Sequence, residues 1–157
     1  MVGMTGHQGL PPHTAELVTP ALRESLARYR PDLVGVTMLG PGADQLFARV
    51  VLELGGALYV VIPARQYRDS FPDEDARRGY DELFAKATYT ERLPHVESTE
   101  AAHMAGGRAV VEASELLVAV WDGQPARGLG GTADVVAYAR ERAIPVKVIW
   151  PEGATRD

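Results

Sequence analysis

The chain has 157 residues, of which 46% are hydrophobic and 24% are charged, as in a single globular domain. It contains no cysteine, which excludes disulfide frameworks, cysteine-ligated metal sites and thiol catalysis. Its net charge of −5, without a cluster of basic residues, disfavours a nucleic-acid-binding protein. No apolar run approaches the roughly 20 residues of a membrane span, and no signal peptide is evident, so we expect a cytoplasmic protein.

The chain opens with an apolar run, Met1–Thr5, whose length predicts a β-strand. Farther along, Thr19 followed by Pro20 is typical of an N-cap and the first residue of a helix. We therefore predict a helix that begins at this pair and buries one apolar face. The residues expected on that face are Leu22, Leu26 and Tyr29.

The next two strands enclose a clear helical pattern. Apolar runs predict strands at Leu33–Leu39 and Ala57–Ile62. Between them, residues Ala43–Leu54 carry apolar side chains at helical spacing, and Gly55-Gly56 predicts the end of that helix. The runs are almost continuously apolar instead of alternating, which is typical of a sheet that is covered on both faces.

Residues 65–94 interrupt this alternation and are rich in charge. The acidic stretch that follows Phe71-Pro72 predicts the start of a helix, because acidic residues favour the positive end of the helix dipole. Tyr80, Leu83 and Phe84 would form its apolar face, and a short extended piece is expected near Thr88–Leu93. We interpret the segment as an insertion in one domain and not as a second domain.

The remainder of the chain returns to the alternation. We predict a helix at Thr99–Ala113, a strand at Leu116–Trp121, a helix at Thr132–Arg142 and a last strand at Pro145–Trp150. Strands that alternate with helices through short connections imply right-handed crossovers. The fold class is therefore α/β: one Rossmann-like, three-layer domain over residues 1–157, with a mostly parallel sheet and helices on both faces.

Glycine-rich turns follow three of the predicted strands. They are Thr5-Gly6-His7-Gln8-Gly9, Gly40-Pro41-Gly42-Ala43-Asp44 and, after Trp121-Asp122-Gly123, Gly128-Leu129-Gly130-Gly131-Thr132. In an open α/β sheet, ligands bind beyond the carboxyl ends of the strands, and the first amides of a helix favour an anion. The turns match neither G-x-G-x-x-G nor the P-loop. They predict a phosphate-bearing ligand outside those two common classes.

Residues of these turns are candidates for contact with that ligand. Gly130, Gly131 and Thr132 are candidates for the phosphate, although Thr132 is equally typical of a helix cap. Asp44 is expected to contact a ribose hydroxyl or a base, because a carboxylate beside a phosphate would repel it; the alternative is again a cap. The other candidate contacts are Thr5, Gly6, Gly40, Gly42 and Ala43.

Three residues are candidates for acid–base chemistry, and several arginines for anion binding. His7 lies on a glycine-flanked loop and is of the residue type suited to acid–base work near neutral pH, and Asp122 and Asp134 are carboxylates near the last glycine turn. Arg108, beside Gly106-Gly107, is a candidate phosphate fork. Arg65, Arg68, Arg77 and Arg78 either close over an anion or form a solvated face. The four histidines lack metal-ligand spacing, so no metal and no resident cofactor is expected.

The glycine motifs together resemble those of the SLOG superfamily, which comprises DprA/Smf-like, LOG-like and YspA-like Rossmannoid proteins. The matching motifs are Thr5-Gly6-His7, Gly40-Pro41-Gly42-Ala43-Asp44, Trp121-Asp122-Gly123 and Gly130-Gly131-Thr132-Ala133-Asp134. The resemblance implies a Rossmann-like fold that binds nucleotides or nucleotide-derived molecules, in a homodimer or a larger homo-oligomer. Its LOG-like branch implies hydrolysis of the N-glycosidic bond of nucleoside monophosphates.

The chain departs from the LOG-like pattern Pro-Gly-Gly-x-Gly-Thr-x-x-Glu. Val135 stands at the position of its glutamate, and the nearest acid, Asp134, comes one residue earlier. One residue on a helix rotates a side chain by about 100°. We therefore predict a binding or sensor protein, with a LOG-like phosphoribohydrolase as the alternative. A DprA-like DNA-handling protein is disfavoured by the acidic balance of the chain.

Overall fold

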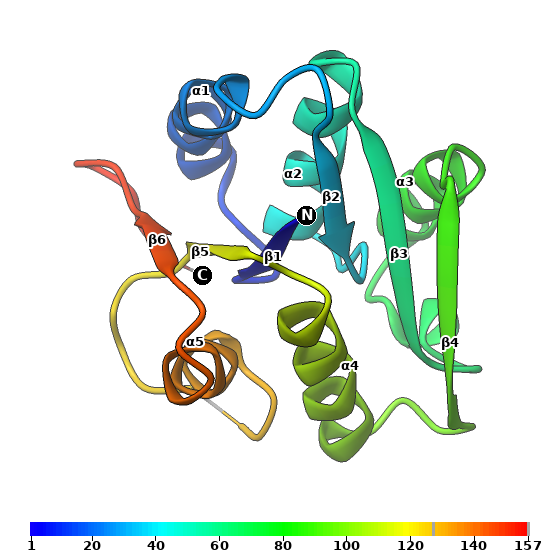
Figure 1. Cartoon of the computed structure of the whole chain (residues 1–157). Coiled ribbons are helices and arrows are strands. Elements are labelled where there is room, and N and C mark those ends of the chain that lie inside the picture. The colour runs from blue at the N-terminus through cyan, green and yellow to red at the C-terminus, as the bar shows by residue number, and fades with distance from the viewer. Residues whose placement is uncertain (127, 157) are drawn as a thin grey trace.

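The computed structural model describes residues 1–126 and 128–156, in which six parallel strands form one sheet (Figure 1). The strands are β1 Val2–Gly6, β2 Val34–Thr37, β3 Ala57–Ala64, β4 Tyr89–His95, β5 Leu116–Val120 and β6 Val146–Ile149. The helices are α1 Pro12–Ala27, α2 Ala43–Glu53, α3 Glu74–Phe84, α4 Glu100–Glu112 and α5 Thr132–Glu141, with a short 3-10 helix, η1, at Arg68–Ser70. The predicted Rossmann-like α/β fold is confirmed.

The sheet has the order β4-β3-β2-β1-β5-β6. Successive strands move from β1 toward one edge as far as β4, and the chain then crosses back to place β5 on the other side of β1. The strand order therefore reverses at β1, and the loops that leave β1 and β5 diverge there. Such a reversal is where α/β sheets bind their ligands.

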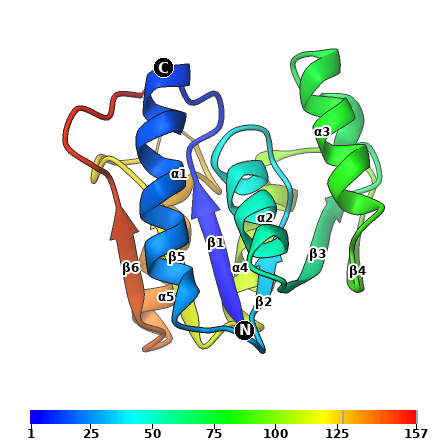
Figure 2. The same ribbon diagram turned by 90° about the horizontal axis from the view of Figure 1, so that it is seen from above.

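Helices cover both faces of the sheet. Helices α1, α2 and α3 lie on one face and α4 and α5 on the other (Figure 1), and all strands point the same way in Figure 2. Each face has its own buried cluster, which accounts for the nearly continuous hydrophobicity of the central strands. None of the helices in the described part of the chain is long and apolar enough to cross a membrane.

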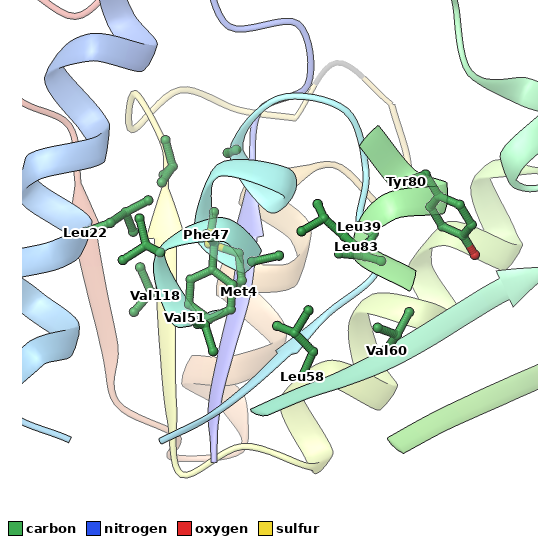
Figure 3. Close-up of a cluster of buried hydrophobic side chains, with 14 of the residues drawn as sticks. Met4, Leu22, Leu39, Phe47, Val51, Leu58, Val60, Tyr80, Leu83 and Val118 are labelled. Atoms are coloured by element: carbon green, nitrogen blue, oxygen red, sulfur yellow. The ribbon is translucent and has the colours of Figure 1, made fainter. Parts of the chain in front are cut away.

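The larger core cluster centres on Phe47 of α2, which is completely buried (Figure 3). Met4 of β1, Val51 of α2 and Leu58 of β3 belong to the same cluster. Gly35 of β2 makes room for the ring, since a Cβ there would lie 2.9 Å from Phe47 Cε1. This packing fixes α2 against the sheet and thereby positions the glycine turn at its N-terminus.

The predicted start of the first helix was wrong. Helix α1 begins at Pro12 and contains Pro20 in its interior. Pro12 suits the first helical position because its missing N–H would have no partner there. The Thr19 hydroxyl donates back to the Ala15 carbonyl oxygen (2.8 Å) inside the helix instead of capping it.

Burial of one face of α1 offsets the helical hydrogen bond that Pro20 cannot donate. Val18, Leu22 and Leu26 are completely buried, in agreement with the predicted positions of the two leucines. Tyr29, the third residue predicted for that face, lies beyond the end of the helix and is partly exposed.

The segment 65–94 contributes more to the sheet than predicted. Its helix, α3, is capped by the Asp73 carboxylate, which accepts the Ala76 amide hydrogen (2.8 Å). The extended piece is a full edge strand, β4, which pairs in parallel with β3. Its side chains are mostly exposed or half-buried, so the sequence lacks the apolar run that marks the other strands.

Two glycines let α4 approach its neighbours closely. A Cβ on Gly106 would press against Met38 Sδ and lie 3.0 Å from Pro63 Cβ, and one on Gly107 would lie 2.6 Å from Val135 Cγ2. The small residues of α4 are therefore used inside the domain, against the sheet and α5. Gly106 and Gly107 are therefore not available as a free face for a second subunit.

Candidate functional site

A pocket of about 360 Å³ lies at the carboxyl edge of the sheet, where the strand order reverses. The loop after β1, the loop after β2 and the glycine turn before α5 form three of its walls. The N-terminal part of α4, Tyr67 and Arg156 complete it. The volume is in the range of small-molecule sites.

The structure brings about half of the predicted site residues into this pocket. Those that line it are Thr5, Gly6, His7, Asp44, Gly130, Gly131 and Thr132. Gly40, Gly42 and Ala43 belong to the adjoining turn without lining it, and Asp122, Asp134 and Arg108 also lie outside the lining. Two of the three proposed acid–base residues are thus not part of the pocket wall.

The turn before α5 offers hydrogen-bond donors to the pocket. Gly131 is the N-cap, and Thr132 is the first helical residue, so the predicted capping role of Thr132 is not observed. The Thr132 hydroxyl makes no hydrogen bond within the described residues, and neither do the amides of Thr132 and Ala133. Free amides and a hydroxyl at a helix N-terminus are the donors that a phosphate requires.

Asp134 supports the turn instead of facing the pocket. Its Oδ2 accepts the amide hydrogen of Gly130 at 3.1 Å. Gly130 has a φ of +85°, and a Cβ there would lie 2.9 Å from Met104 N, so the turn requires glycine. The position that the LOG-like pattern gives to a glutamate holds Val135, which is buried against α4.

In the turn before α2 an aspartate also accepts the amide hydrogen of a glycine, but here the carboxylate lines the pocket. Asp44 Oδ2 accepts the amide hydrogen of Gly40 (3.0 Å), but this carboxylate is buried and lines the pocket. Burial raises the pKa of Asp44 to about 7, although the Gly40 amide and the Thr37 hydroxyl favour its charged form. Asp44 therefore exchanges its proton near neutral pH.

Tyr67 places a second polar group beside Asp44. The side chain is 97% buried, packed edge-on against Phe71, Tyr80 and His103, and it lines the pocket. Its Oη lies 3.1 Å, and Asp44 Oδ2 lies 3.3 Å, from the point where a Cβ on Gly40 would stand. Burial, and then the nearby Asp44 charge, raise the pKa of Tyr67 well above its usual value, so the hydroxyl stays protonated.

The hydroxyls of Tyr67 and Thr5 make no hydrogen bond to another described residue, and neither oxygen is fully enclosed, because every fully buried side-chain N or O among the described residues has a partner. Thr5 is 93% buried and lines the same pocket. Together with Thr132, three unpaired hydroxyls from separate elements therefore converge on a space that a polar molecule can fill.

His7 and Asp122 form a pair at the edge of the pocket. His7 Nε2 accepts the backbone amide hydrogen of Asp122 (3.1 Å) and lies 3.2 Å from its Oδ1. Burial opposes the ionisation of Asp122. The amide of Gln124, the His7 ring and Arg156 outweigh that effect and lower the pKa of Asp122. The carboxylate orients two neighbours that do line the pocket.

The arginines predicted as anion ligands lie elsewhere. Arg108 is exposed, with its guanidinium 5.4 Å from the centre of the Tyr138 ring. Arg68 pairs with Asp81, Arg77 with Glu74 and Arg78 with Asp75. Arg65 lies at a separate surface hollow beside β4. This arrangement agrees with a solvated charged face, and none of the five lines the main pocket.

The pocket contains functional groups that sequence reasoning missed. They are Gln8, Met38, Tyr67, Glu100, His103 and Arg156. Burial lowers the pKa of His103, whose Nε2 lies 2.7 Å from the Ser98 hydroxyl. No three His, Asp or Glu side chains of the described chain come together as a metal site. Gln8 lies in the glycine turn after β1, but no local motif marks the other five residues, because they come from four separate segments.

Comparison with known proteins finds neither a family model nor a curated protein that matches this sequence. Solved structures do match. DNA processing protein A (DprA) from Streptococcus pneumoniae has a TM-score of 0.70 and 19% identity, covering 97% of this chain and 50% of that chain. DprA from Helicobacter pylori, described for its single-stranded DNA binding mode, has a TM-score of 0.70 and 16% identity, covering 98% of this chain and 67% of that one.

A third structural match is the molybdenum cofactor binding protein of the phototrophic bacterium Rippkaea orientalis. It has a TM-score of 0.59 and 17% identity, and the match covers 94% of this chain and 74% of that one. The chain thus spans half to two thirds of the two DprA chains. At these identities the matches show the fold alone, and the chain shares with them the Rossmann-like α/β fold that the sequence predicted.

Proposed function

We propose that the chain binds a nucleotide or a nucleotide-like phosphorylated molecule in the pocket at the carboxyl edge of the sheet. The observation that carries this proposal is the start of α5, where the Thr132 hydroxyl and the amides of Thr132 and Ala133 have no partner within the described residues. These donors would hold the phosphate, with the helix dipole adding to the attraction.

Other polar groups of the lining would hold the uncharged part of the ligand. Asp44 offers carboxylate oxygens, and Tyr67 and Thr5 offer hydroxyls that have no partner among the described residues. A ribose or a base presents both donors and acceptors, so it complements such a mixed polar wall. The lining combines donors at the start of α5 with a carboxylate and two hydroxyls, which supports a molecule with one anionic part and one neutral polar part.

Binding without LOG-like catalysis is favoured by where Asp134 and Asp122 lie. The carboxylates that do line the pocket are instead Asp44, in the other glycine turn, and Glu100 of α4. Asp134 is hydrogen-bonded to Gly130, and Asp122 faces His7 and Arg156. Cleavage of an N-glycosidic bond needs a carboxylate close to the anomeric carbon, and a misplacement of about 1 Å costs about 100-fold in rate. The proposed role is therefore that of a sensor or binding protein.

A small molecule is favoured over DNA, although the fold is shared with a DprA described for single-stranded DNA binding. The net charge of −5 opposes binding of a polyanion, and the pocket itself contains the carboxylates Asp44 and Glu100. A single phosphate can be placed away from both. A strand of DNA would bring several phosphates to the same acidic surface.

The test is binding of AMP, GMP and CMP, measured by calorimetry and by the shift in melting temperature. Thr132→Val removes the hydroxyl at nearly constant volume and is expected to weaken binding by about tenfold. Thr90→Val, the same change on the exposed strand β4, is the matched control. A Gly131→Val variant, whose Cβ would lie 2.9 Å from Ala126 Cβ, should abolish binding by displacing the turn.

Failure of all three nucleotides to bind the wild type would overturn the proposal. Binding that is unchanged in both Thr132→Val and Gly131→Val would show that the ligand occupies another site. A poly-dT oligonucleotide in the same assay decides between a small molecule and DNA. Tighter binding of the oligonucleotide than of any nucleotide would favour a DNA-handling role.

We also propose that the chain self-associates, as the family resemblance implies. Strand β6 is an edge of the sheet with an unpaired side, and it exposes 43% of Val148. Light scattering at tens of micromolar is expected to give at least twice the mass of one chain. A mass equal to one chain would refute the proposal.

A further inference from the structure

The segment after β6 turns back toward the start of α1, as Figure 2 shows at the carboxyl end of the strands. Pro151 and Ala154 close a turn, with the Ala154 amide donating to the Pro151 carbonyl oxygen (3.0 Å). Gly153 adopts a φ of +88° in that turn and packs beside Leu17 of α1. Of the residues that follow, Thr155 therefore lies against the start of α1, and Arg156 lines the pocket.

One buried side chain fixes this segment. Thr14 of α1 is completely buried, and its hydroxyl donates to the Thr155 carbonyl oxygen at 2.7 Å. The same hydroxyl oxygen accepts the Thr155 amide hydrogen at 2.9 Å. A single hydroxyl thus holds both backbone groups of Thr155, an arrangement that we call the Thr14 clasp. The Thr155 hydroxyl adds a contact to His13 Nε2 at 2.8 Å.

The Thr14 clasp places the guanidinium of Arg156 at the pocket. Arg156 lines the pocket, its side chain is 80% buried, and its Nη1 lies 3.6 Å from Asp122 Oδ2. Among the described residues of the lining, Arg156 is the only lysine or arginine, whereas Asp44 and Glu100 are acidic. A guanidinium binds phosphate through charged, bidentate hydrogen bonds, so Arg156 is the residue of this lining best suited to hold a phosphate at a place away from the two carboxylates.

We propose that Arg156 is a phosphate-binding residue of the site and that Thr14 is its positioning residue, acting through the clasp. The inference rests on the proposed function, because it assigns a second set of donors to the same phosphate. The Thr132 hydroxyl and the α5 amides hold the phosphate from the helix side, and the Arg156 guanidinium holds it from the side of the 151–156 segment. Asp122 keeps the guanidinium in place before the ligand arrives.

The experiment measures the affinity for AMP and for inorganic phosphate by calorimetry. Arg156→Gln is expected to weaken AMP binding by about 10–100-fold, the range for loss of a charged hydrogen bond. Arg108→Gln is the matched control, because this arginine is exposed and lies outside the pocket. Melting temperatures of both variants verify that each is folded.

The positioning role of Thr14 has its own readout. Thr14→Val removes the clasp hydroxyl and is expected to weaken AMP binding about as much as Arg156→Gln does. Thr14→Ser restores the hydroxyl and should rescue the affinity. The double variant Thr14→Val/Arg156→Gln should bind no more weakly than Arg156→Gln alone, because a clasp without its arginine has nothing to position. If Thr14 had a merely structural role, the losses of affinity of the two single variants would add in the double variant.

The outcomes separate this inference from the proposed function. If Thr132→Val loses affinity while Arg156→Gln binds as the wild type does, the inference is overturned and the proposed function stands. An equal loss in Arg108→Gln and Arg156→Gln would also overturn it, since the effect would then be one of overall charge. If the wild type binds neither AMP nor phosphate, both proposals fall.

Discussion

The glycine turns before α2 and α5 are built in the same way and present opposite chemistry to the pocket. In each, an aspartate accepts the amide hydrogen of a glycine four residues earlier, Gly40 for Asp44 and Gly130 for Asp134. Asp44 is the second residue of its helix and Asp134 the third, an offset of about 100° around the axis. The first turn therefore shows its carboxylate to the pocket, and the second shows its amides and a hydroxyl.

Under the proposed function, one loop design would serve two ends of one ligand. A turn with an acceptor exposed suits hydroxyl and amino groups, and a turn with donors exposed suits a phosphate. A shift of the aspartate by one position along the helix decides whether the turn presents a carboxylate or amides and a hydroxyl to the pocket. The same offset explains why Asp134 is not a substitute for the glutamate of the LOG-like pattern.

The largest expected effect comes from disturbing the turns themselves. Gly42→Ala should lower the free energy of unfolding by about 2–5 kcal/mol, which combines left-handed strain with overpacking. Gly42 has a φ of +90°, and its Cβ would lie 2.9 Å from the His7 carbonyl oxygen. Gly130→Ala should cost a similar amount, since the equivalent Cβ meets backbone atoms of α4. Urea unfolding measures both.

Gly55→Ala is the matched control for these variants. Gly55 has a φ of +79° but no atom within 4 Å of its Cβ position, so it pays only for left-handed strain, about 1 kcal/mol. If Gly42→Ala lowered the free energy of unfolding no more than Gly55→Ala does, the turn would have accommodated the added methyl group without loss of stability. The close approach of the α2 turn to the loop after β1 would then have no energetic role.

The next effect distinguishes the two aspartates through pH. The pKa of Asp44 in the folded state, about 7, lies above its ordinary value of 3.8, because burial favours the neutral form. The folded state therefore holds a proton that the unfolded state has released, and the stability contributed by this group falls as pH rises from about 4 through 7. Over that window the loss is about 2–4 kcal/mol.

The measurement is urea unfolding of wild type and Asp44→Asn between pH 4.5 and pH 9. Asparagine does not ionise, so the difference in stability between the two proteins isolates the carboxylate. Wild type should lose stability relative to the variant as pH rises. A difference that stays constant with pH would mean that water reaches Asp44 in the folded protein.

The smallest effect is expected from Asp134→Asn. The amide oxygen of asparagine can still accept the Gly130 amide hydrogen, so the fold and AMP binding should be retained. Release of free base from AMP, GMP and CMP should be weak or absent in wild type and variant alike. Robust turnover that disappears in Asp134→Asn would overturn the sensor role and favour the hydrolase. Equal turnover in both proteins would indicate a contaminating enzyme.

Much of the fold was predictable because its central strands are apolar throughout. Strand β4 was expected only as a short extended piece, since its exposed side chains, such as Tyr89 and Thr90, give no apolar run. The start of α1 was misplaced because Pro20 is typical of a helix start, and only the burial of Val18 and its neighbours reveals that the helix continues through it.

The pocket residues that stand in glycine motifs were predictable from the sequence. Those that the fold brings in from distant segments were not. Thr132 and Asp44 stand in recognisable turns that open helices. Tyr67 comes from the segment 65–94, and Arg156 comes from the segment after β6, so neither has a neighbour in sequence that belongs to the site. Arg108 was chosen for its adjacent glycines, but those glycines serve helix packing.

The Thr14 clasp joins residues 141 positions apart through a pair of hydrogen bonds at the periphery of the domain. It can open locally while the strands remain paired, because it holds no core side chain. Under the proposed role of Arg156, the apparent affinity for the ligand is then proportional to the fraction of molecules in which the clasp is closed. Since the Thr155 amide hydrogen is held by Thr14 Oγ1, its exchange with solvent deuterium reports that fraction directly, and ligand binding should slow the exchange.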